Sequence, residues 1–477
     1  MSAERQLPIL RRGEPYTSVE LEPLCDHRTG AVLAQVSQAN SGLVSRDLCH
    51  QADCWAALQA ISFEDAVACC ERAADIFMQD ELPLGDENQG PEEFVAMQSA
   101  TTAMPVAMCR RNMTKIEFML REMKSVLRGL SADDRLCGES FRADGGQDPA
   151  YVPRGHSLGV VLPNNSPGVH ALWIPAFALR VPLYLRPGTM EPWTPYRISA
   201  ALRKAGYPAA AINIYPSGHA AGNTLLAKAA RGMVFGDAKT TQTWAEQGTV
   251  EIHGPGMSKV LLDVEAAGDV DRYMDVITRS IAFNGGRSCV NASSVWTPSG
   301  GRELADALAR SVATTRPTSL DDPAAALCGF PNATIAEAIH AAIESGLQVP
   351  GAEDITARYR EGDRLTRVDG TTFLQPTIIW CEDSDHPLAN REFLFPYASV
   401  IEVPADAMPD RVGNTLVATA ITTDPVLIDR FYQSPEIVRL NVGPIPTCEI
   451  DWTQPHEGNL FYHLLQRRVF QYEAMPA

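Results

Sequence analysis

One cysteine, Cys289, stands at the end of a glycine-rich segment, Phe283–Cys289 (FNGGRSC), and is a candidate nucleophile. Glycines let a backbone come close to a ligand and adopt dihedral angles that other residues avoid. A cysteine reacts as its thiolate, and a neighbouring positive charge lowers the pKa of the thiol. Arg287, two residues earlier, could supply that charge. The alternative is a small, buried and unreactive cysteine, which is what a free cysteine commonly is.

The elements that must position this cysteine begin with a series of short apolar runs. The runs are Leu158–Leu162, Leu183–Arg186, Ala211–Tyr215, Met233–Phe235 and Val260–Leu262. Helix-like stretches near 168–180, 194–205 and 221–230 separate the first four runs, and another short helix is expected near 238–246. Buried strands that alternate with helices predict a mainly parallel sheet with helices on both faces. Ligands of such sheets bind at the carboxyl ends of the strands.

The segments that directly follow the first four runs are rich in glycine, proline and polar residues. They are Pro163–Pro167 (PNNSP), Pro187–Thr189 (PGT), Pro216–His219 (PSGH) and Gly236–Ala238 (GDA). This chemistry suits a nucleotide, although strand–helix loops have such compositions for turn formation alone. The chain has neither the GxGxxG fingerprint of dinucleotide-binding folds nor the GxxxxGK[ST] phosphate loop.

Further elements are expected on both sides of this region. The expected strands are Ala31–Val36, Thr377–Trp380 and Ser399–Val403, and the expected helices follow Ser62 and cover 93–105, 113–128, Asp271–Ile281, Arg302–Ala313 and Thr334–Ser345. The 113–128 helix carries an apolar stripe, which predicts a core position, and Gly129 is its expected end. The later elements predict a second α/β unit built around Cys289. Residues 131–156 are turn-rich and are interpreted as a loop or a projecting hairpin.

Composition narrows the class of protein. A chain of 477 residues is too long for one small core, so two or three domains are expected. Its composition, 45% hydrophobic and 21% charged residues, is typical of globular proteins. A net charge of -18 disfavours nucleic acid and anionic membranes as partners. The 11 cysteines form no CxxC pair and the histidines form no HxxxH, so no metal site is predicted. A polar N-terminus and this cysteine usage fit a cytoplasmic protein.

The signals occur in an order that resembles the aldehyde dehydrogenase superfamily over roughly residues 25–470. Asp26–Ala34 resembles "NPATGEVLA", Pro163–Pro167 "PWNFP", Leu185–Thr189 "LKPSE", Gly206–Pro216 "GLPPGVVNVVPG", Phe235–Asp237 "FTGS", Glu251–Ile252 the start of "ELGGK", Phe283–Cys289 "FxNxGQxC" and Glu392–Pro396 "EIFGP". Each match alone is weak. The order and spacing of the eight together carry the resemblance.

The resemblance implies a role for each matching residue. Cys289 would attack an aldehyde, the Asn165 amide and the Cys289 backbone N–H would bind the resulting oxyanion, and Glu251 would activate water. NAD or NADP would be held by residues in the matching motifs, namely Pro163, Asn164, Arg186, Pro187, Thr189, Gly236, Asp237 and Glu392. Each also has an ordinary structural interpretation, such as an Asx turn for Asn165 or a solvated carboxylate for Glu392. His253 is a weaker candidate for the base.

The implied fold is α/β: a Rossmann-like parallel-sheet cofactor domain, an α/β catalytic domain and a small oligomerisation β element. We place the domains at 1–252, with the projecting element near 131–156, and at 253–442. A C-terminal tail at 443–477 joins subunits, so a homodimer or homotetramer is expected. The aldehyde itself is not identified.

Several positions depart from the family pattern. Arg186 and Thr189 replace a lysine and a glutamate, and Asp237 replaces a serine, so NAD and NADP both stay open. His253-Gly254-Pro255 follows Glu251 in place of the usual residues, and Pro455–Asn459 (PHEGN) replaces "GGxKxSGxG". Three interpretations therefore stay open: oxidation of an aldehyde to a carboxylate, an acylating enzyme in which CoA or another thiol takes the acyl group, and a non-catalytic, assembly-forming relative.

Overall fold

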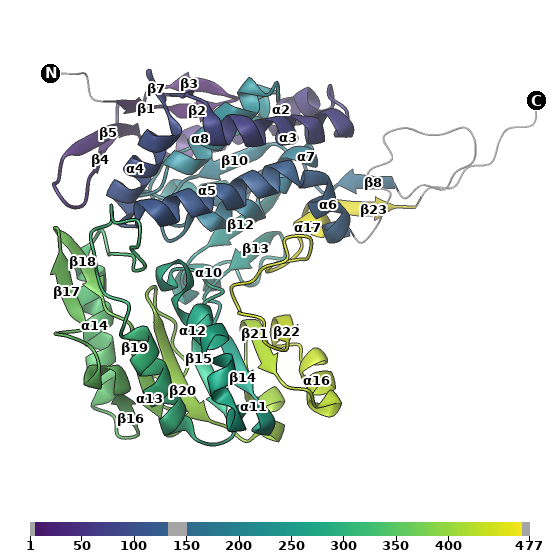
Figure 1. The fold of residues 1–477 in the computed structure, drawn as a ribbon. Coiled ribbons are helices and arrows are strands. Elements are labelled where there is room, and N and C mark those ends of the chain that lie inside the picture. The colour runs from purple at the N-terminus through teal and green to yellow at the C-terminus, as the bar shows by residue number, and fades with distance from the viewer. Residues whose placement is uncertain (1–4, 132–149, 470–477) are drawn as a thin grey trace, which may run out of the picture.

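Two separate seven-stranded sheets organise the chain, which the computed structural model describes over residues 5–131 and 150–469 (Figure 1). The first sheet has the order β13 (Val250–His253), β12 (Arg231–Phe235), β9 (Leu158–Val161), β10 (Leu183–Arg186), β11 (Ile212–Ile214), β2 (Ile9–Arg11) and β3 (Glu14–Tyr16). The strands from β13 to β11 are parallel, whereas β2 and β3 join antiparallel. The predicted parallel sheet is confirmed, and its central strands are buried as their apolar runs require.

Helices cover both faces of this first sheet. One large core joins it to α3 (Phe63–Gln79), α4 (Pro91–Thr102), α5 (Val106–Arg121), α6 (Met123–Ser131) and α8 (Trp193–Lys204), and a second core joins it to α1 (Ser41–Leu48) and α9 (His219–Lys228). Ser62 caps α3 as expected, with its hydroxyl accepting the Asp65 N–H at 3.0 Å. The predicted single helix over 113–128 is wrong, because the helix breaks at Glu122 into α5 and α6. The apolar stripe along it is buried as predicted.

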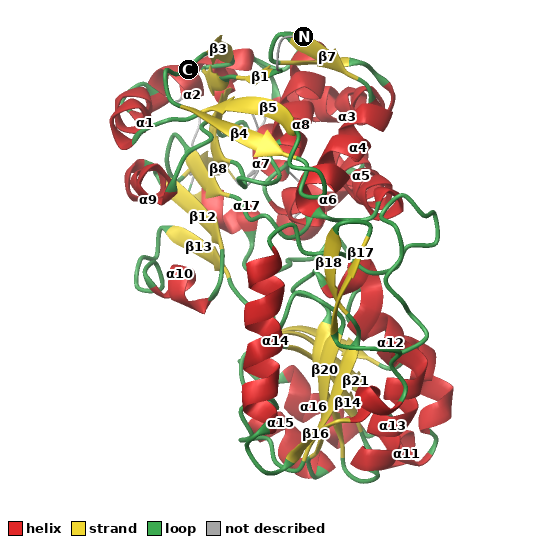
Figure 2. Ribbon diagram, turned by 90° about the vertical axis from the view of Figure 1, so that its left-hand side faces the viewer, coloured by secondary structure: helices red, strands yellow, loops and turns green. Residues whose placement is uncertain are grey.

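The second sheet has the order β16 (Ala352–Asp354), β19 (Thr377–Cys381), β20 (Tyr397–Glu402), β15 (Ala292–Thr297), β14 (Ser258–Leu262), β21 (Thr415–Ile421) and β22 (Ile437–Val442). All but β16 are parallel. One face packs on α11 (Val264–Gly268), α12 (Met274–Ala282) and α13 (Gly301–Val312), and the other on α14 (Ala333–Leu347), α15 (Met408–Arg411) and α16 (Pro425–Tyr432) (Figure 2). The apolar run at Val260–Leu262 therefore belongs to this sheet. The chain changes sheet between His253 and Ser258, close to the predicted domain boundary.

Smaller sheets complete the fold. They are β1 (Gln6–Leu7) with β5 (Val32–Ser37) and β4 (Leu21–Cys25), β6 (Leu82–Leu84) with β7 (Glu87–Gln89), β17 (Leu365–Val368) with β18 (Thr371–Leu374), and β8 (Ala150–Pro153) with β23 (Leu465–Arg468). The short helices are α2 (Gln51–Leu58), α7 (Pro175–Ala178), α10 (Ala238–Gln242) and α17 (Leu460–Leu464).

The C-terminal segment leaves β22 and returns to the part of the molecule that holds the first sheet, where β23 pairs with β8 in a separate two-stranded sheet (Figure 1). Most of the predicted projecting element lies outside the described residues, and the part within them contributes β8. Gly129 does not end its helix, which continues to Ser131. A Cβ on Gly129 would lie 1.7 Å from the Thr453 carbonyl oxygen, so the glycine lets the returning segment pack directly on α6. This return path brings tail residues to the Cys289 region.

Candidate active site

A tight turn after α12 carries the segment that ends in Cys289. Asn284, Gly285 and Gly286 have φ of 54°, 65° and 71°, the left-handed region that glycine adopts without strain. A Cβ on Gly286 would lie 2.3 Å from the backbone carbon of Phe395, so this position also needs glycine for space. The Asn284 side chain holds the turn by donating to the Ser166 hydroxyl at 3.1 Å. The two sheets are thereby joined at the nucleophile turn.

Cys289 packs against the segment that opens the second sheet. The Ser258 hydroxyl donates to the Cys289 carbonyl at 2.9 Å, and a Cβ on Gly256 would lie only 1.9 Å from the same oxygen. The Glu392 carboxylate accepts the Met257 N–H at 2.7 Å. Glu392 therefore braces the backbone behind Cys289, which differs from its predicted role as a ligand of the cofactor ribose but does not contradict it.

Cys289 and Asn165 line one cavity of about 230 Å³. Asn165 lies after β9, and its amide nitrogen donates a long bond, 3.4 Å, to the Arg287 carbonyl. The cavity walls come from α5, the segment after β9, the nucleophile turn and the C-terminal segment: Lys115, Asn165, Ser166, Gly168, Val169, Leu172, Arg279, Phe283, Ser288, Cys289, Val290, Cys448, Glu449, Ile450, Trp452 and His456. The structure thus brings together the predicted nucleophile and the predicted oxyanion donor.

Arg287 was expected to supply a positive charge to Cys289, but its side chain makes other contacts. Its guanidinium is buried and donates to the Thr102 carbonyl at 2.9 Å and to the Gly329 carbonyl. Its charged group also lies 5.6 Å from the centre of the Phe330 ring. Arg287 therefore ties the nucleophile turn to the last residue of α4 and to the Gly329 segment.

The electrostatics around Cys289 disfavour its thiolate. Burial raises the pKa of the Cys289 thiol strongly, and the carboxylates of Glu457 and Glu392 raise that pKa further. Burial also raises the pKa of Glu392 to about 7, against the opposing effect of the Met257 and Gly256 N–H groups. A carboxyl group with this pKa exchanges a proton near neutral pH.

Glu251 does not line the Cys289 cavity. Its carboxylate accepts from His253 Nε2 at 3.0 Å, and His253 Nδ1 lies 3.1 Å from the Glu457 carboxylate. The imidazole also stacks on Phe235, with ring centres 4.5 Å apart. Burial opposes a charge on His253, but the hydrogen bonds to Glu251 and Glu457 outweigh burial and raise the pKa of His253 to about 9. At neutral pH this is an imidazolium between two carboxylates.

His456 lies between this charged triad and the nucleophile. Its ring lines the Cys289 cavity and also a smaller cavity of about 30 Å³ that Glu251, His253 and Glu457 line. Leu172 and Trp452 are the other walls that the two cavities share. Burial lowers the pKa of His456 to about 3, so its imidazole is neutral at physiological pH.

Apart from Glu392, the predicted cofactor residues lie at or after the carboxyl ends of strands of the first sheet. Asn164 links the loops after β9 and β10: its amide donates to the Thr189 hydroxyl at 3.3 Å and its carbonyl accepts the Met190 N–H at 2.8 Å. A Cβ on Gly188 would lie 2.3 Å from the Pro163 carbonyl, so the two loops touch. Arg186 is buried and donates Nε to the Ser217 carbonyl at 3.0 Å.

A small cavity of about 30 Å³ opens beside these loops. Pro187, Gly188 and Thr189 form one wall, and Pro216 and Ser217 form another. The remaining lining residues are Glu22, Pro23, Leu24, Val36, Gln38 and Pro192, which come from β4, β5 and the chain near them and from the end of the β10 loop. Hydroxyl, carboxylate and amide groups around a concave site at this edge suit the hydroxyls of a ribose.

Gly236 and Asp237 lie apart from that cavity, at the start of α10. Asp237 caps the helix by accepting the Thr240 N–H at 2.8 Å, and this bond lowers the pKa of its carboxyl. A Cβ on Gly236 would lie 2.9 Å from Thr240. Both residues therefore have a local structural role, and their predicted contact with a cofactor stays a prediction.

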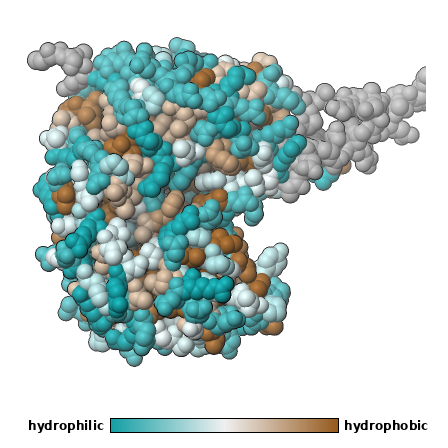
Figure 3. Space-filling model, viewed as in Figure 1, coloured by the Kyte–Doolittle hydropathy of each residue, from teal (hydrophilic) through white to brown (hydrophobic). Residues whose placement is uncertain are grey.

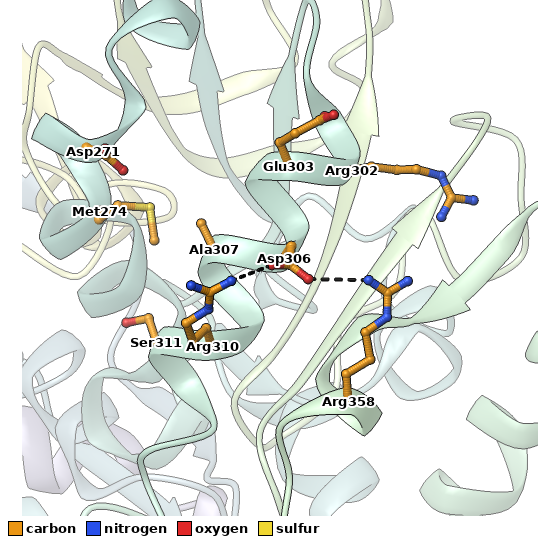
Figure 4. Close-up of a pocket in the computed structure, with 9 residues that line it drawn as sticks. All are labelled: Asp271, Met274, Arg302, Glu303, Asp306, Ala307, Arg310, Ser311 and Arg358. Carbon is orange, nitrogen blue, oxygen red and sulfur yellow. Dashed lines mark hydrogen bonds and ion pairs between the residues drawn. The ribbon is translucent and has the colours of Figure 1, made fainter.

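A larger surface cavity, about 600 Å³, lies elsewhere, over α12 and α13 (Figure 4). Two of its arginines already contact a carboxylate, because Arg310 and Arg358 both reach Asp306 at 2.9 and 3.3 Å. The third, Arg302, pairs with Glu353. The described residues that line this cavity include no cysteine and no side-chain amide, the two groups that the Cys289 cavity combines. In the described part of the chain, no group of His, Cys, Asp and Glu is arranged to hold a metal ion.

The comparisons with known proteins decide the family. The model of the aldehyde dehydrogenase family matches residues 17–433. This chain belongs to the aldehyde dehydrogenase family. Within the described residues, no helix is long and apolar enough to cross a membrane.

Solved structures of aldehyde dehydrogenases share the fold. Indole-3-acetaldehyde dehydrogenase of P. syringae, in complex with NAD+ and IAA, has 17% identity and a TM-score of 0.81, over 98% of this chain and 96% of that one. A 3,6-anhydro-L-galactose dehydrogenase in complex with NADP has 15% identity and a TM-score of 0.77, over 98% and 99%. Aldehyde dehydrogenase 21 of Physcomitrella patens, in complex with the product succinate, has 16% identity and a TM-score of 0.74, over 98% and 95%. At these identities the likeness confirms the predicted fold class.

The aldehyde dehydrogenase motifs left several cavity residues unidentified. Lys115 and Trp452 line the Cys289 cavity, and Glu22 lines the one beside Thr189. None lies in a motif, and each reaches its cavity from a distant part of the chain. His456 and Glu457 stood out only as a departure from the family tail, which was the one available signal.

Proposed function

We propose that this protein oxidises an aldehyde with NAD or NADP, with Cys289 as the nucleophile. The observation that carries the proposal is that the Cys289 thiol and the Asn165 amide line the same cavity, at the junction of the two sheets. A thiolate and a hydrogen-bond donor for the developing oxyanion are what attack on an aldehyde carbon requires. Joint retention of these groups speaks against a non-catalytic, assembly-forming relative.

In the proposed reaction the Cys289 sulfur bonds to the aldehyde carbon and gives a hemithioacetal. Glu392 is the proposed acceptor of the thiol proton, because its charge acts on Cys289 and its pKa is raised to about 7. The Asn165 amide and the Cys289 backbone N–H donate to the oxyanion. NAD or NADP, when bound, would supply the acceptor for the hydride that leaves this carbon. The acyl group then remains on Cys289 as a thioester.

The edge of the first sheet fits the cofactor. Thr189 and Glu22 line its small cavity, and Asn164 orders the adjoining loops. Arg186 keeps its charge beside these loops, and Pro163, Pro187, Gly236 and Asp237 shape the same edge. The solved relatives described above are in complex with NAD+ and with NADP, which supports this class of cofactor.

Water is the proposed acyl acceptor, with Glu251 as its base and a carboxylic acid as the product. A second candidate is an acylating enzyme, in which CoA or another thiol takes the acyl group. The observation that favours the second is that Glu251 is bound to His253 in a separate cavity. A carboxylate that accepts from an imidazolium is a weakened base.

Rapid mixing of the protein with NAD or NADP and a panel of aldehydes, with and without CoA, tests the proposal. A burst of reduced nicotinamide followed by turnover without CoA would support the hydrolytic enzyme. A burst that turns over only with CoA would establish the acylating enzyme. No burst, together with no nucleotide binding in a titration, would refute both and favour the non-catalytic interpretation.

We further propose a cytoplasmic homodimer or homotetramer. β22 is the edge strand of the second sheet and exposes Val438 and Val442, and edge strands of this kind are usually covered. Figure 3 shows hydrophobic residues beside the hollow on this side of the molecule, where β22 and α16 lie in Figure 1. All ten described cysteines are free, in keeping with a reducing compartment. Light scattering on purified protein would give the mass of the assembly, and a monomer would contradict this proposal.

A further inference from the structure

The Cys289 cavity contains an ammonium group that pairs with no carboxylate of the described residues. Lys115 projects from α5 into the cavity wall. Its Nζ donates one long bond, 3.3 Å, to the Asn112 amide oxygen, and lies 4.8 Å from the centre of the Phe283 ring. An ammonium has three N–H donors, so this environment leaves two of them for another partner.

The other charges of the cavity are already satisfied. Arg279 and Glu449 both line it, and they pair with each other at 3.0 Å. Asn112, which holds Lys115, is fixed in turn because its amide donates to the Met108 carbonyl at 3.0 Å and to Asn284 at 3.2 Å. Lys115 is therefore held in place, and the cavity has an excess of one positive charge.

A partly buried cation without a counter-ion is costly unless a ligand supplies the opposite charge. Burial lowers the pKa of Lys115 to about 8, so the ammonium is still largely protonated at neutral pH. The remaining walls are mainly apolar or aromatic, from Val169, Leu172, Ile450 and Trp452. A ligand that fits has an anionic end for Lys115, a short apolar middle and a reactive end at Cys289.

We infer that the substrate is a short aldehyde that carries a carboxylate at its far end, and that Lys115 binds this carboxylate. The inference rests on the proposed function. The cavity of about 230 Å³ corresponds to roughly seven or eight water volumes. A four- to six-carbon chain with an aldehyde at one end and a carboxylate at the other is of this size. An Nζ–carboxylate pair in a desolvated site is a charge-assisted hydrogen bond of the strong kind.

The test compares 4-oxobutanoate and 5-oxopentanoate with butanal and pentanal, using the first burst of reduced nicotinamide so that the acyl acceptor is irrelevant. We expect the wild-type burst rate at low substrate concentration to be at least tenfold higher for the carboxylates. In Lys115→Met, the carboxylate concentration that half-saturates the burst rate should rise roughly 10- to 100-fold, while the limiting burst rate and the bursts with uncharged aldehydes change little. Lys115→Arg should restore part of the preference. The matched control, Lys124→Met, changes an exposed lysine on α6 and should leave both classes unchanged.

A binding measurement separates this inference from the proposed function. Calorimetric titration of succinate into Cys289→Ala and into Cys289→Ala/Lys115→Met needs no catalysis, and we expect the second protein to bind roughly 10- to 100-fold more weakly. Equal succinate affinity in the two proteins would overturn the inference whatever the enzyme does. Equal oxidation of butanal and 4-oxobutanoate would also overturn it, while the proposed function would stand. No burst with any aldehyde would instead overturn the proposed function.

Discussion

The charged triad of Glu251, His253 and Glu457 makes a quantitative prediction about stability and pH. The pKa of His253 is raised from 6.5 to about 9, so the folded protein binds this proton more tightly than the unfolded chain does. Its contribution to the free energy of unfolding is complete below pH 6.5 and disappears as the pH rises through 9. This rise in pKa corresponds to about 3 kcal/mol at low pH and to a little less at pH 7.

The perturbation is His253→Gln, which keeps a hydrogen-bonding side chain of similar size and removes the charge. The unfolding entropy of a globular chain is about 2.1 cal/mol/K per residue, or about 1 kcal/mol/K for all 477 residues. The variant should therefore melt about 2 to 3 °C below the wild type at pH 7 when both unfold as a unit. At pH 10 the wild-type imidazole is neutral, so the two melting temperatures should converge.

The assay is differential scanning calorimetry of both proteins at half-unit steps from pH 7 to pH 10, at constant ionic strength. His219→Gln serves as the matched control, because His219 is exposed at the start of α9 and should shift neither the melting temperature nor its pH dependence. A gap between wild type and His253→Gln that stays constant across this range would refute the reasoning. It would mean that His253 is neutral in the folded protein and that Glu251 is not held by a cation.

Four other changes test the site. Cys289→Ala should abolish the burst of reduced nicotinamide and leave cofactor affinity nearly intact, and normal turnover would remove the nucleophile assignment. Glu251→Gln should allow one burst and then stall if Glu251 activates water, whereas unchanged steady-state turnover would place the base elsewhere. Glu22→Gln should raise the use of NADP relative to NAD about fivefold, because a carboxylate repels a 2′-phosphate, and an unchanged ratio measured by initial rates would contradict this. Gly256→Ala should slow the burst at least roughly tenfold by displacing the Cys289 backbone, while Gly218→Ala, where a Cβ meets open space, should not.

The central strands of the first sheet were predictable because they are buried on both faces. Leu183–Arg186 is matched to the residue by β10, Leu158–Leu162 is one residue longer than β9, and Ala211–Tyr215 is longer than β11 by one residue at each end. Continuous apolar runs with glycine and proline after them leave little choice of structure. Boundaries within long helical patterns were less predictable, since the break at Glu122 interrupts no apolar repeat.

β15 shows why other strands were missed. It is a central strand of the second sheet and is fully buried, yet its sequence is ASSVWT. Its two serines are tolerated because Ser294 bonds the Ser399 hydroxyl at 2.9 Å on the neighbouring strand and Ser293 donates to the Ser258 carbonyl at 3.4 Å. These partners lie far away in the sequence. Hydrophobic periodicity alone therefore does not predict a buried strand here.

In the candidate site, too, some features were predictable from the sequence and others were not. The turn around Cys289 and the loop with Asn165 were recognisable because each is a local motif with its own glycines, prolines and amides. The direction of the Arg287 side chain was not, because it depends on the left-handed residues before it and on carbonyls of Thr102 and Gly329. The role of Lys115 was unpredictable for a similar reason. It depends on which residues surround the ammonium group, and these described neighbours, none of which pairs with it through a carboxylate, come from separate segments of the chain.

Two departures from the family pattern, the residues that follow Glu251 and the Pro455–Asn459 segment of the tail, are physically coupled. His253 follows Glu251 on β13, and Glu457 belongs to the segment that replaces the family's glycine-rich tail. The structure places them 3.1 Å apart, with Gly458 so close to Glu251 that a Cβ there would lie 2.6 Å from its carboxyl carbon. Glu457 without His253 would bring a second carboxylate to this place with no cation to pair with it, which is costly, whereas His253 pairs with both Glu251 and Glu457. The pair therefore stabilises a tail path that also brings His456 and Trp452 to the Cys289 cavity. The geometry of the substrate cavity and the charge state of the triad thus depend on the same five-residue segment, Pro455–Asn459.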